Sequence, residues 1–261
     1  MLREVLNKTD YVPEGQTYDP EIHYNAQWAD VVFRRFLMLL EAPGEPLRTS
    51  HLEDWYSGYI WSSILDDCLL NLPRMTVERK ESPCRASSIR KNRNRQNSKS
   101  SRMKIGARLD AIIRTVEDDY YEYGGMEAGK TFLGGERSSK WLGDGFKLCR
   151  ALRDMLARLH GLLGDKERVE VKGERKKIQV VGVATGGLAL QWVRMGNVGG
   201  HVCCLQRERV MGVPKSVGGL HELMKLLMSV AQMKVRSKSF PCGPQPGYPC
   251  RRDRVSISRP F

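Results

Sequence analysis

Residues 103–115 and 120–129 decide the fold; with the turn between them they read MKIGARLDAIIRT, VEDD, YYEYGGMEAG. Both runs are rich in apolar, β-branched or aromatic side chains and flank an acidic turn, so they predict two antiparallel strands. Folding them about that turn places Asp110 opposite Gly125, with Glu127 one pair away. Two carboxylates on neighbouring strands are then close together. Because buried like charges are costly, the pair predicts a site for a divalent cation, Mg²⁺.

The segments around this hairpin predict an α+β fold in which helices pack on a mixed sheet. Apolar side chains at helical spacing indicate the helices, and short apolar runs bounded by turn residues indicate further strands. Ser50 and Glu53 predict a capping box, and Gly186-Gly187 predicts a tight turn. In chain order the predicted elements are a helix over 26–42, a helix from Ser50 to Pro73, strands over 103–115 and 120–129, a helix from Ser138 or Ser139 to Gly161, strands over 177–186, 188–195 and 201–206, and a helix through Leu220 to Ala231.

The same spacing predicts which faces of the helices are buried. On the second helix the expected buried side chains are Trp55, Tyr59, Ile64 and Cys68. On the third helix they are Leu142, Phe146, Cys149, Leu152, Leu156 and Leu159.

Charge is distributed unevenly along the 261 residues. Residues 74–104 hold eleven Lys and Arg against two Glu, and residues 234–261 hold seven against one Asp. Within 79–102 the only large aliphatic side chain is Ile89, so this stretch is expected to form a flexible basic loop. The predicted organisation is a flexible arm (1–25), one domain (26–233) interrupted by the basic loop (79–102), and a basic, Pro-rich tail (234–261).

Basic runs of this kind attract polyanions, mainly nucleic acid, because binding releases counterions. The expected contacts are Arg90, Lys91, Arg93, Arg95, Lys99 and Arg102. The alternative is that the loop and tail are solvated and only keep the protein soluble. The first ten residues show no secretory signal, and the longest uncharged run, 178–193, is too short to span a bilayer. A soluble, intracellular, nuclear protein without a membrane partner is therefore expected.

Residues 124–131 also match the nucleotide-binding pattern GxxxxGK[ST], which ends in Lys130 and Thr131. A phosphate loop needs a helix that begins at the lysine, because the amino terminus of that helix stabilises the bound anion. Gly134 and Gly135 would break such a helix in its first turn. The strand interpretation is therefore preferred, and ATP or GTP binding is a further alternative.

The order Asp110, hairpin, Glu127-Ala128-Gly129-Lys130, helix and second hairpin resembles the restriction-endonuclease-like PD-(D/E)xK superfamily. The longer pattern is similar to a group of uncharacterised fungal proteins that share a degenerate form of this core. The segments that carry the resemblance are WYSGYIW (55–61), ASSIRKN (86–92), RLDAI (108–112), EYGGMEAGK (122–130), KWLGDGFKL (140–148) and VGVATGGLALQ (181–191).

The resemblance implies a three-layer α/β/α domain with a mixed central sheet and, if the site is active, a Mg²⁺-dependent phosphodiesterase. Asp110 and Glu127 would hold the metal ion, and Lys130 would stabilise the charge that develops on the phosphodiester. The same fold without catalysis, acting as an interaction module, is the alternative.

The sequence departs from the superfamily pattern at one position. The lysine is expected two residues after Glu127, where this chain has Gly129, and Lys130 points to the other face of a regular strand. A bulge at Gly129, or a lysine from the next helix (Lys140 or Lys147), would restore the geometry.

Overall fold

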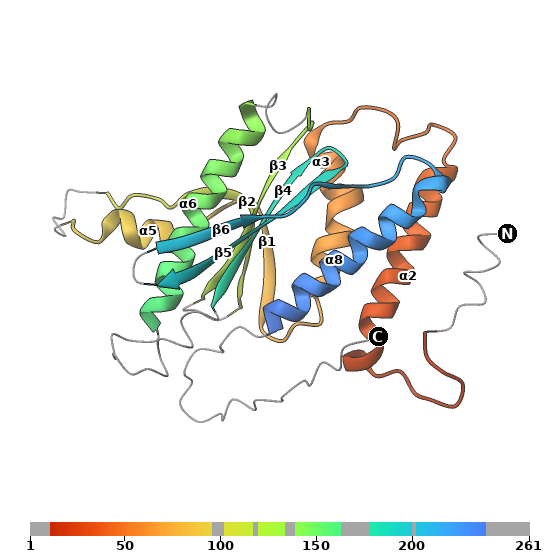
Figure 1. Cartoon of the computed structure of the whole chain (residues 1–261), viewed down its shortest axis with the longest axis horizontal. Coiled ribbons are helices and arrows are strands. Elements are labelled where there is room, and N and C mark those ends of the chain that lie inside the picture. Colours follow the sequence, from red (N-terminus) through yellow and green to blue (C-terminus); the bar gives the residue numbers. More distant parts are fainter. Residues whose placement is uncertain are drawn as a thin grey trace.

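The computed structural model describes residues 11–95, 102–116, 120–133, 139–162, 178–199 and 202–238. Its strands are β1 (Met75–Pro83), β2 (Arg108–Thr115), β3 (Glu122–Gly129), β4 (Gln179–Gly186), β5 (Ala189–Gly199), β6 (Val202–Arg207) and β7 (Met211–Gly212). They form one sheet in the order β1-β2-β3-β4-β5-β6, with β7 also beside β5 (Figure 1). Strands β3 and β4 run parallel and the other described pairs antiparallel. The predicted α+β class with a mixed sheet is confirmed.

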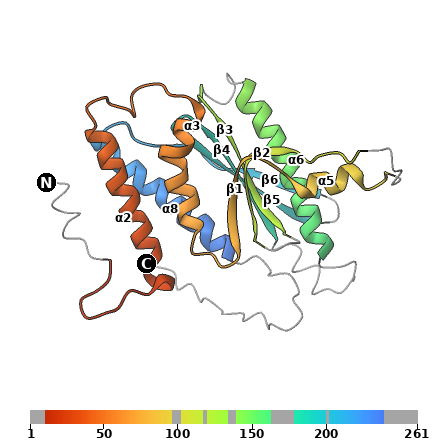
Figure 2. The same cartoon turned by 180° about the vertical axis from the view of Figure 1, so that it is seen from behind.

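Helices cover both faces of this sheet (Figures 1 and 2). The helices on one face are α2 (Pro20–Glu41), the consecutive α3 (Glu53–Tyr56), η1 (Ser57–Asp66) and α4 (Asp67–Leu69), and α8 (Leu220–Lys238). The helices on the other face are α5 (Arg85–Asn92) and α6 (Ser139–Leu162). Each face has its own buried cluster, which includes Phe36 and Trp61 on the first and Leu148 and Leu152 on the second.

Helix α2 begins earlier than predicted, at Pro20. Asp19 caps it by accepting a hydrogen bond from the Glu21 N–H, and Pro20 occupies the first turn, where its missing N–H breaks no helical bond. Residues 20–25 therefore belong to the folded domain, which corrects the predicted arm of residues 1–25. Residues 1–10 of that arm lie outside the described part of the chain.

The second helix does not start with the predicted capping box. Leu52 occupies the capping position and no side chain caps the helix, so the role predicted for Ser50 is wrong. Ten residues of this helix, η1, have the wider π-helical turn. A wider turn rotates the buried face away from a 3.6-residue spacing. Tyr59, predicted to be buried, is 50% exposed, whereas Tyr56 and Ile60 are buried.

The stretch 79–102, predicted to be a flexible loop, is folded over its first part. Strand β1 pairs with β2 and runs to Pro83, and helix α5 follows directly. The sequence MTVERKESP did not predict a strand because charged side chains interrupt its apolar alternation, which an edge strand tolerates. Residues 96–101 lie outside the described part of the chain.

Strands β2 and β3 pair with each other, but in a different register from the predicted one. Ile112 lies opposite Gly125, where Asp110 was expected. The pairing shifts between Ile113 and Arg114, which inserts an extra residue in β3 that a count from the turn does not foresee. Because the displacement is two residues, each side chain keeps its predicted face.

Helix α6 starts at Ser139, as predicted, but its first two turns bury a different stripe. Leu142 and Phe146 are 36% and 61% exposed, whereas Trp141 and Leu148 are buried. The second half follows the prediction, with Leu152, Leu156 and Leu159 in the core. The β4–β5 hairpin and strand β6 are also where the sequence predicts them, and the last helix contains the predicted residues. This helix runs to Lys238, so residues 234–238 belong to it, which corrects the predicted start of the tail at residue 234. Gly187 takes a φ of +57° in the hairpin turn, a conformation that glycine adopts without strain.

Candidate functional site

The candidate site lies where the start of β2, the end of β3, the first half of α6 and the start of α3 meet. Asp110 of β2 accepts a hydrogen bond of 2.6 Å through Oδ2 from the backbone N–H of Ala128, the residue that follows Glu127 in β3. Asp110 is partly buried and Glu127 is only 3% exposed. The hairpin therefore brings the two predicted carboxylates together.

A lysine from α6 contacts the buried carboxylate. Lys147 Nζ donates a hydrogen bond of 3.1 Å to Glu127 Oε2 and lies 3.0 Å from Oε1. The approach to Oε1 lacks hydrogen-bond geometry, so this buried oxygen has no hydrogen-bond donor among the described residues. Burial raises the pKa of Glu127 to about 8; Lys147 opposes this rise and Asp110 adds to it. Near neutral pH, Glu127 therefore populates both its protonated and its ionised form.

A second lysine of α6 reaches the other side of the same strand end. Lys140 Nζ donates to Glu53 Oε2 at 2.8 Å and to the Ala128 carbonyl at 3.4 Å. The hydrogen bond to Glu53 raises the pKa of Lys140. The backbone of Ala128 thus donates a hydrogen bond from its N–H to Asp110 and accepts one at its carbonyl from Lys140. One short segment of β3 thereby links three polar side chains from three different elements.

Asp144 completes the charged face of α6. It lies one turn after Lys140 and nearly one turn before Lys147, so the three side chains share a face. Burial raises the pKa of Asp144, while the two lysines oppose that rise. The residues of this acid–lysine cluster are Glu53, Asp110, Glu127, Asp144, Lys140 and Lys147. When all are ionised, the carboxylates outnumber the ammonium groups.

Lys130 does not belong to this cluster in the structure. From Gly124 to Gly129, strand β3 pairs with β4 without a shift in register. Alternation along the strand therefore directs Lys130 away from the face of Glu127, and its side chain is exposed. The structure places the two α6 lysines that the sequence offered as alternatives, Lys140 and Lys147, beside the carboxylate strand end, and it directs Lys130 elsewhere.

The geometry of a phosphate loop is also absent from residues 124–131. Most of this stretch is strand β3, and residues 130–133 are not helical. The next described helix, α6, starts at Ser139, so no described helix begins at Lys130. The alternative of nucleotide binding at this pattern therefore lacks its main structural requirement.

The donor set of the cluster fits a divalent cation. Asp110 and Glu127 offer carboxylate oxygens, the ligands that Mg²⁺ prefers, and Glu127 Oε1 is buried without a hydrogen bond. In the part of the chain that the structure describes, no three His, Cys, Asp or Glu side chains form a metal-binding group. Mg²⁺ is often held by one or two carboxylates together with water and substrate phosphates, and two carboxylates suit that mode.

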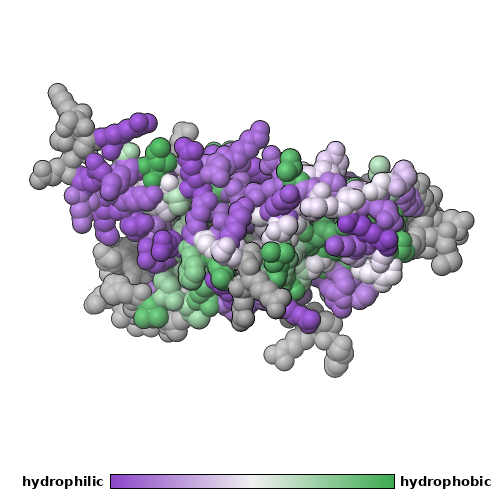
Figure 3. Space-filling view, turned by 90° about the horizontal axis from the view of Figure 1, so that it is seen from above, coloured by the Kyte–Doolittle hydropathy of each residue, from purple (hydrophilic) through white to green (hydrophobic). Residues whose placement is uncertain are grey.

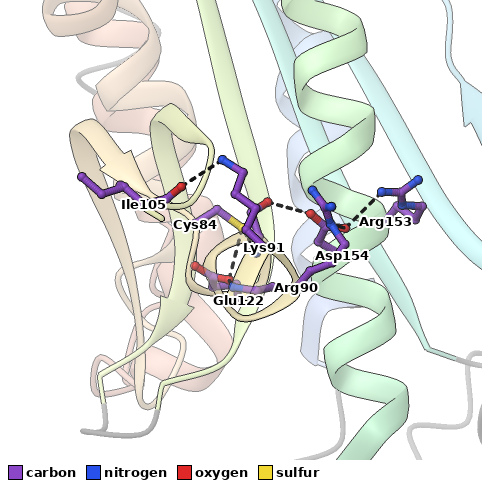
Figure 4. Close-up of polar contacts among 9 residues, drawn as sticks. Cys84, Arg90, Lys91, Ile105, Glu122, Arg153 and Asp154 are labelled. Atoms are coloured by element: carbon purple, nitrogen blue, oxygen red, sulfur yellow. Dashed lines mark hydrogen bonds and ion pairs between the residues drawn. The ribbon is translucent and has the colours of Figure 1, made fainter. Parts of the chain in front are cut away.

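At the other end of β3 from the cluster, a buried glutamate of this strand anchors helix α5. Glu122 is 1% exposed and accepts hydrogen bonds from the N–H groups of Arg85 (2.6 Å) and Ala86 (2.8 Å) at the amino end of α5. The Cys84 thiol also donates to Glu122, at 3.4 Å (Figure 4). A carboxylate at this end of a helix satisfies unpaired N–H groups and interacts favourably with the helix dipole.

A buried aspartate of α6 holds the other side of α5. Asp154 is 4% exposed; it accepts a hydrogen bond of 2.8 Å from Ser87 Oγ and pairs with Arg90 Nε at 2.7 Å (Figure 4). Arg153 also contacts it, at 3.3 Å. Periodicity could not reveal Glu122 or Asp154 as anchors, because their partners lie far away in the sequence.

The basic residues predicted to bind nucleic acid have different environments in the structure. Arg90 is engaged with Asp154, and Lys91 donates to the Ile105 carbonyl at 2.9 Å (Figure 4). All five of the described residues in this set are exposed, including Arg90 and Lys91. Lys99 lies outside the described residues. Two of the predicted side chains, Arg90 and Lys91, thus make contacts within the fold.

Comparisons with known proteins identify no relative. No protein-family model matches the chain, and neither a curated protein nor a solved structure is significantly similar to it. Among the described residues, no helix is both long and apolar enough to cross a membrane. The function is therefore inferred from the geometry of the acid–lysine cluster and its surroundings.

Proposed function

We propose that this chain is a nucleic-acid-binding protein with a nuclease-like fold of the PD-(D/E)xK type, and that its acid–lysine cluster cleaves phosphodiester bonds with Mg²⁺. The observation that carries the proposal is the meeting of Asp110, Glu127 and Lys147 at the ends of β2 and β3. Lys147 brings from the helix the ammonium group that Gly129 does not provide from the strand. In this proposal, a lysine of the helix takes the place of the strand lysine that the superfamily pattern has beside the carboxylates.

The arrangement of the elements supports the same proposal. The antiparallel strands β1, β2 and β3 are followed by α6 and then by β4, which is parallel to β3. The carboxylates lie on β2 and β3, in the order that the resemblance implies. Segment 140–148, which carries part of the resemblance, contributes Lys140, Asp144 and Lys147 to the cluster.

The residues have distinct roles in this proposal. Asp110 and Glu127 hold the metal ion, which supplies a polarising charge and an activated water when it is bound. Lys147 fixes the orientation of Glu127 and balances its charge. The side chain of Lys140 is 60% exposed, so it is the cation of the cluster that an incoming phosphate oxygen can reach.

Titration calorimetry with Mg²⁺ and with Mn²⁺ tests the proposal. We expect heat of binding for the wild-type chain and its loss in both Asp110→Asn and Glu127→Gln. Asp54→Asn is the matched control, because Asp54 is exposed, carries the same charge and adjoins Glu53 in the sequence. A labelled oligonucleotide should be cleaved by the wild-type chain and by Asp54→Asn. It should not be cleaved by Asp110→Asn or Glu127→Gln. Metal binding that survives both site substitutions would overturn the proposed site.

A second candidate function is an inactive interaction module with the same fold. It is favoured by the contact between Lys147 and Glu127, because an ammonium group already balances the buried carboxylate without a metal ion. In this case the wild-type chain binds nucleic acid with a strong salt dependence but neither binds nor requires Mg²⁺. The calorimetry and cleavage experiments above separate the two functions.

A further inference from the structure

Residues 85–95, which contain helix α5, and residues 102–108 form one surface, called the α5 platform here. These described residues include eight Lys and Arg and no acidic residue. On the face shown in Figure 3, hydrophilic side chains cover the end of the molecule that carries α5, with single apolar ones among them. A surface with this charge attracts polyanions.

The α5 platform is held in one shape by contacts between its two segments. Asn92 Nδ2 donates to the Lys104 carbonyl at 2.8 Å, and the Lys104 N–H donates back to Asn92 Oδ1 at 2.9 Å. Lys91 and Ser88 donate to the carbonyls of Ile105 and Lys104, at 2.9 and 3.0 Å. Four hydrogen bonds therefore fix the extended segment alongside α5 before any ligand arrives.

A glycine fixes the same segment at the start of α5. The Cys84 N–H donates to the Ala107 carbonyl at 2.7 Å. A Cβ atom at Gly106 would lie 1.8 Å from the Cys84 carbonyl oxygen, so only glycine allows this approach. The platform is thus a packed part of the domain.

The α5 platform is also joined to the elements that carry the acid–lysine cluster. Glu122 anchors α5 to β3, and Asp154 anchors it to α6. Its extended segment continues into β2, where Arg108 precedes Asp110 by two residues. A strand of nucleic acid bound along the platform would therefore be held at a fixed position relative to Asp110.

The platform also exposes aliphatic side chains between its cations. Ile89, Met103 and Ile105 are 48%, 69% and 51% exposed. Phosphates gain nothing from such groups, but bases and sugars do, through burial of apolar surface. In a duplex the base faces are stacked inside, whereas an unpaired strand presents them to a protein. The mixture of cations and aliphatic groups favours an unpaired strand.

We propose that the α5 platform binds a single-stranded nucleic acid and leads it toward Asp110 and Glu127. The aliphatic side chains contact bases and sugars. The cations that contact phosphates are Arg93, Arg95, Arg102 and Lys104, each of which is exposed. The direction toward the cluster rests on the proposed function, whereas binding to the platform requires no metal ion.

Fluorescence anisotropy with a labelled single strand and a duplex of equal length, in EDTA, tests this inference on the full chain. We expect the single strand to bind about tenfold more tightly, a difference of about 1.4 kcal/mol. Met103→Ser with Ile105→Ser should reduce this preference while leaving duplex binding unchanged. Arg93→Gln with Arg95→Gln should lower the salt dependence of single-strand binding by about 0.7 per lost phosphate contact.

Lys215→Gln with Lys225→Gln is the control for total charge. These exposed lysines lie just before and on α8, across the sheet from α5. The inference is overturned if this control weakens binding as much as the arginine pair does, if the duplex binds as tightly as the single strand, or if only anionic phosphatidylserine vesicles are bound.

Cleavage assays in Mg²⁺ separate this inference from the proposed function. If the wild-type chain binds the single strand through the platform but does not cleave it, the proposed nuclease activity is wrong and the proposed platform binding is supported. Cleavage that disappears in Asp110→Asn but is unaffected by all platform variants would contradict the platform alone.

Discussion

Glu127 is a carboxylate whose protonation is linked to folding. Its pKa is raised from 4.5 to about 8, chiefly by burial, so the folded chain binds a proton that the unfolded chain has released. Unfolding between these pH values therefore releases a proton, and the free energy of unfolding falls as the pH rises. The stabilising protonated form is fully populated below pH 4.5 and is lost as the pH passes about 8.

Glu127→Gln should remove this pH dependence. In the wild-type chain, the titration of Glu127 should lower the free energy of unfolding by up to about 1.4 kcal/mol for each pH unit between pH 5 and 8. Urea unfolding at several pH values measures it. Glu222→Gln, at an exposed position, should leave the slope in this window intact. An identical slope in wild type and Glu127→Gln would show that Glu127 titrates normally.

Asp154 should contribute to stability through the contacts it makes with α5. Asp154→Asn keeps the shape of the side chain but removes the charge that Arg90 requires, with an expected cost of about 2 kcal/mol. Glu45→Gln is the control, because it removes an ion pair in which both side chains are exposed, worth less than about 1 kcal/mol. Equal losses in thermal unfolding experiments would mean that Asp154 does not anchor the helix.

At the residue scale, the sequence predicted the site only in part. Asp110 and Glu127 follow from the pairing of two adjacent strands, which is a local property. Lys147 could be named only as one of two options, because the rotation of a helix about its axis is decided by packing. Asp144 was not singled out, because an aspartate on a helix is most often exposed to solvent.

At the scale of elements, strand β1 has a strained segment beside the cluster. Its pairing with β2 shifts between Arg79 and Ser82, opposite the start of β2, where Asp110 lies. The two residues in this bulge, Lys80 and Glu81, have φ values of +70° and +54°. Side chains disfavour this region by about 1–2 kcal/mol per residue. Bulges of this kind often lie next to active sites, where they redirect side chains.

Lys80→Gly should therefore stabilise the protein. Glycine removes the strain of the positive φ and loses some of that gain through its larger unfolded-state entropy, so we expect a net increase of up to about 1 kcal/mol in the free energy of unfolding. Thr76→Gly, in the regular part of β1, should instead destabilise by about 0.5–1 kcal/mol. Chemical unfolding measures the free energy of unfolding of both variants. A loss of stability in Lys80→Gly as well as in Thr76→Gly would show that the positive φ of Lys80 does not strain the protein.

The long, strongly amphipathic helices and the glycine turn were predictable because their signals are local. Helix α5 and strand β1 were not, because their stability comes from distant partners. Glu122 and Asp154 lie outside the stretch that they hold in place, and a window over residues 79–102 contains neither of them. The π-helical turn of η1 likewise displaced the predicted buried face of the second helix.

At the scale of the whole molecule, the sheet order determines which thiols a reagent can reach. Cys203 and Cys204 lie on β6 at one edge of the sheet and are exposed. Cys68 and Cys84 lie in the two buried clusters, and burial raises the pKa of each to about 12, so their reactive thiolate form is scarce.

Alkylation of the native protein should therefore modify Cys203 and Cys204 before Cys68 and Cys84. Cys68 and Cys84 should react only after unfolding in urea, and peptide mass spectrometry can quantify each thiol separately. Modification of Cys84 at the rate of Cys204 in the native state would show that α5 is not docked as described.

The parallel pairing of β3 with β4 has a consequence for the time course of folding. The antiparallel strands β1, β2 and β3 are neighbours in sequence, but β4 can join β3 only after the chain has passed through α6. The entropy lost in closing that long connection delays the step. Pulsed hydrogen exchange during refolding should accordingly find the amides of β2 and β3 protected before those of β4 and β5. Simultaneous protection of all four strands would mean that the two halves of the sheet assemble in a single step.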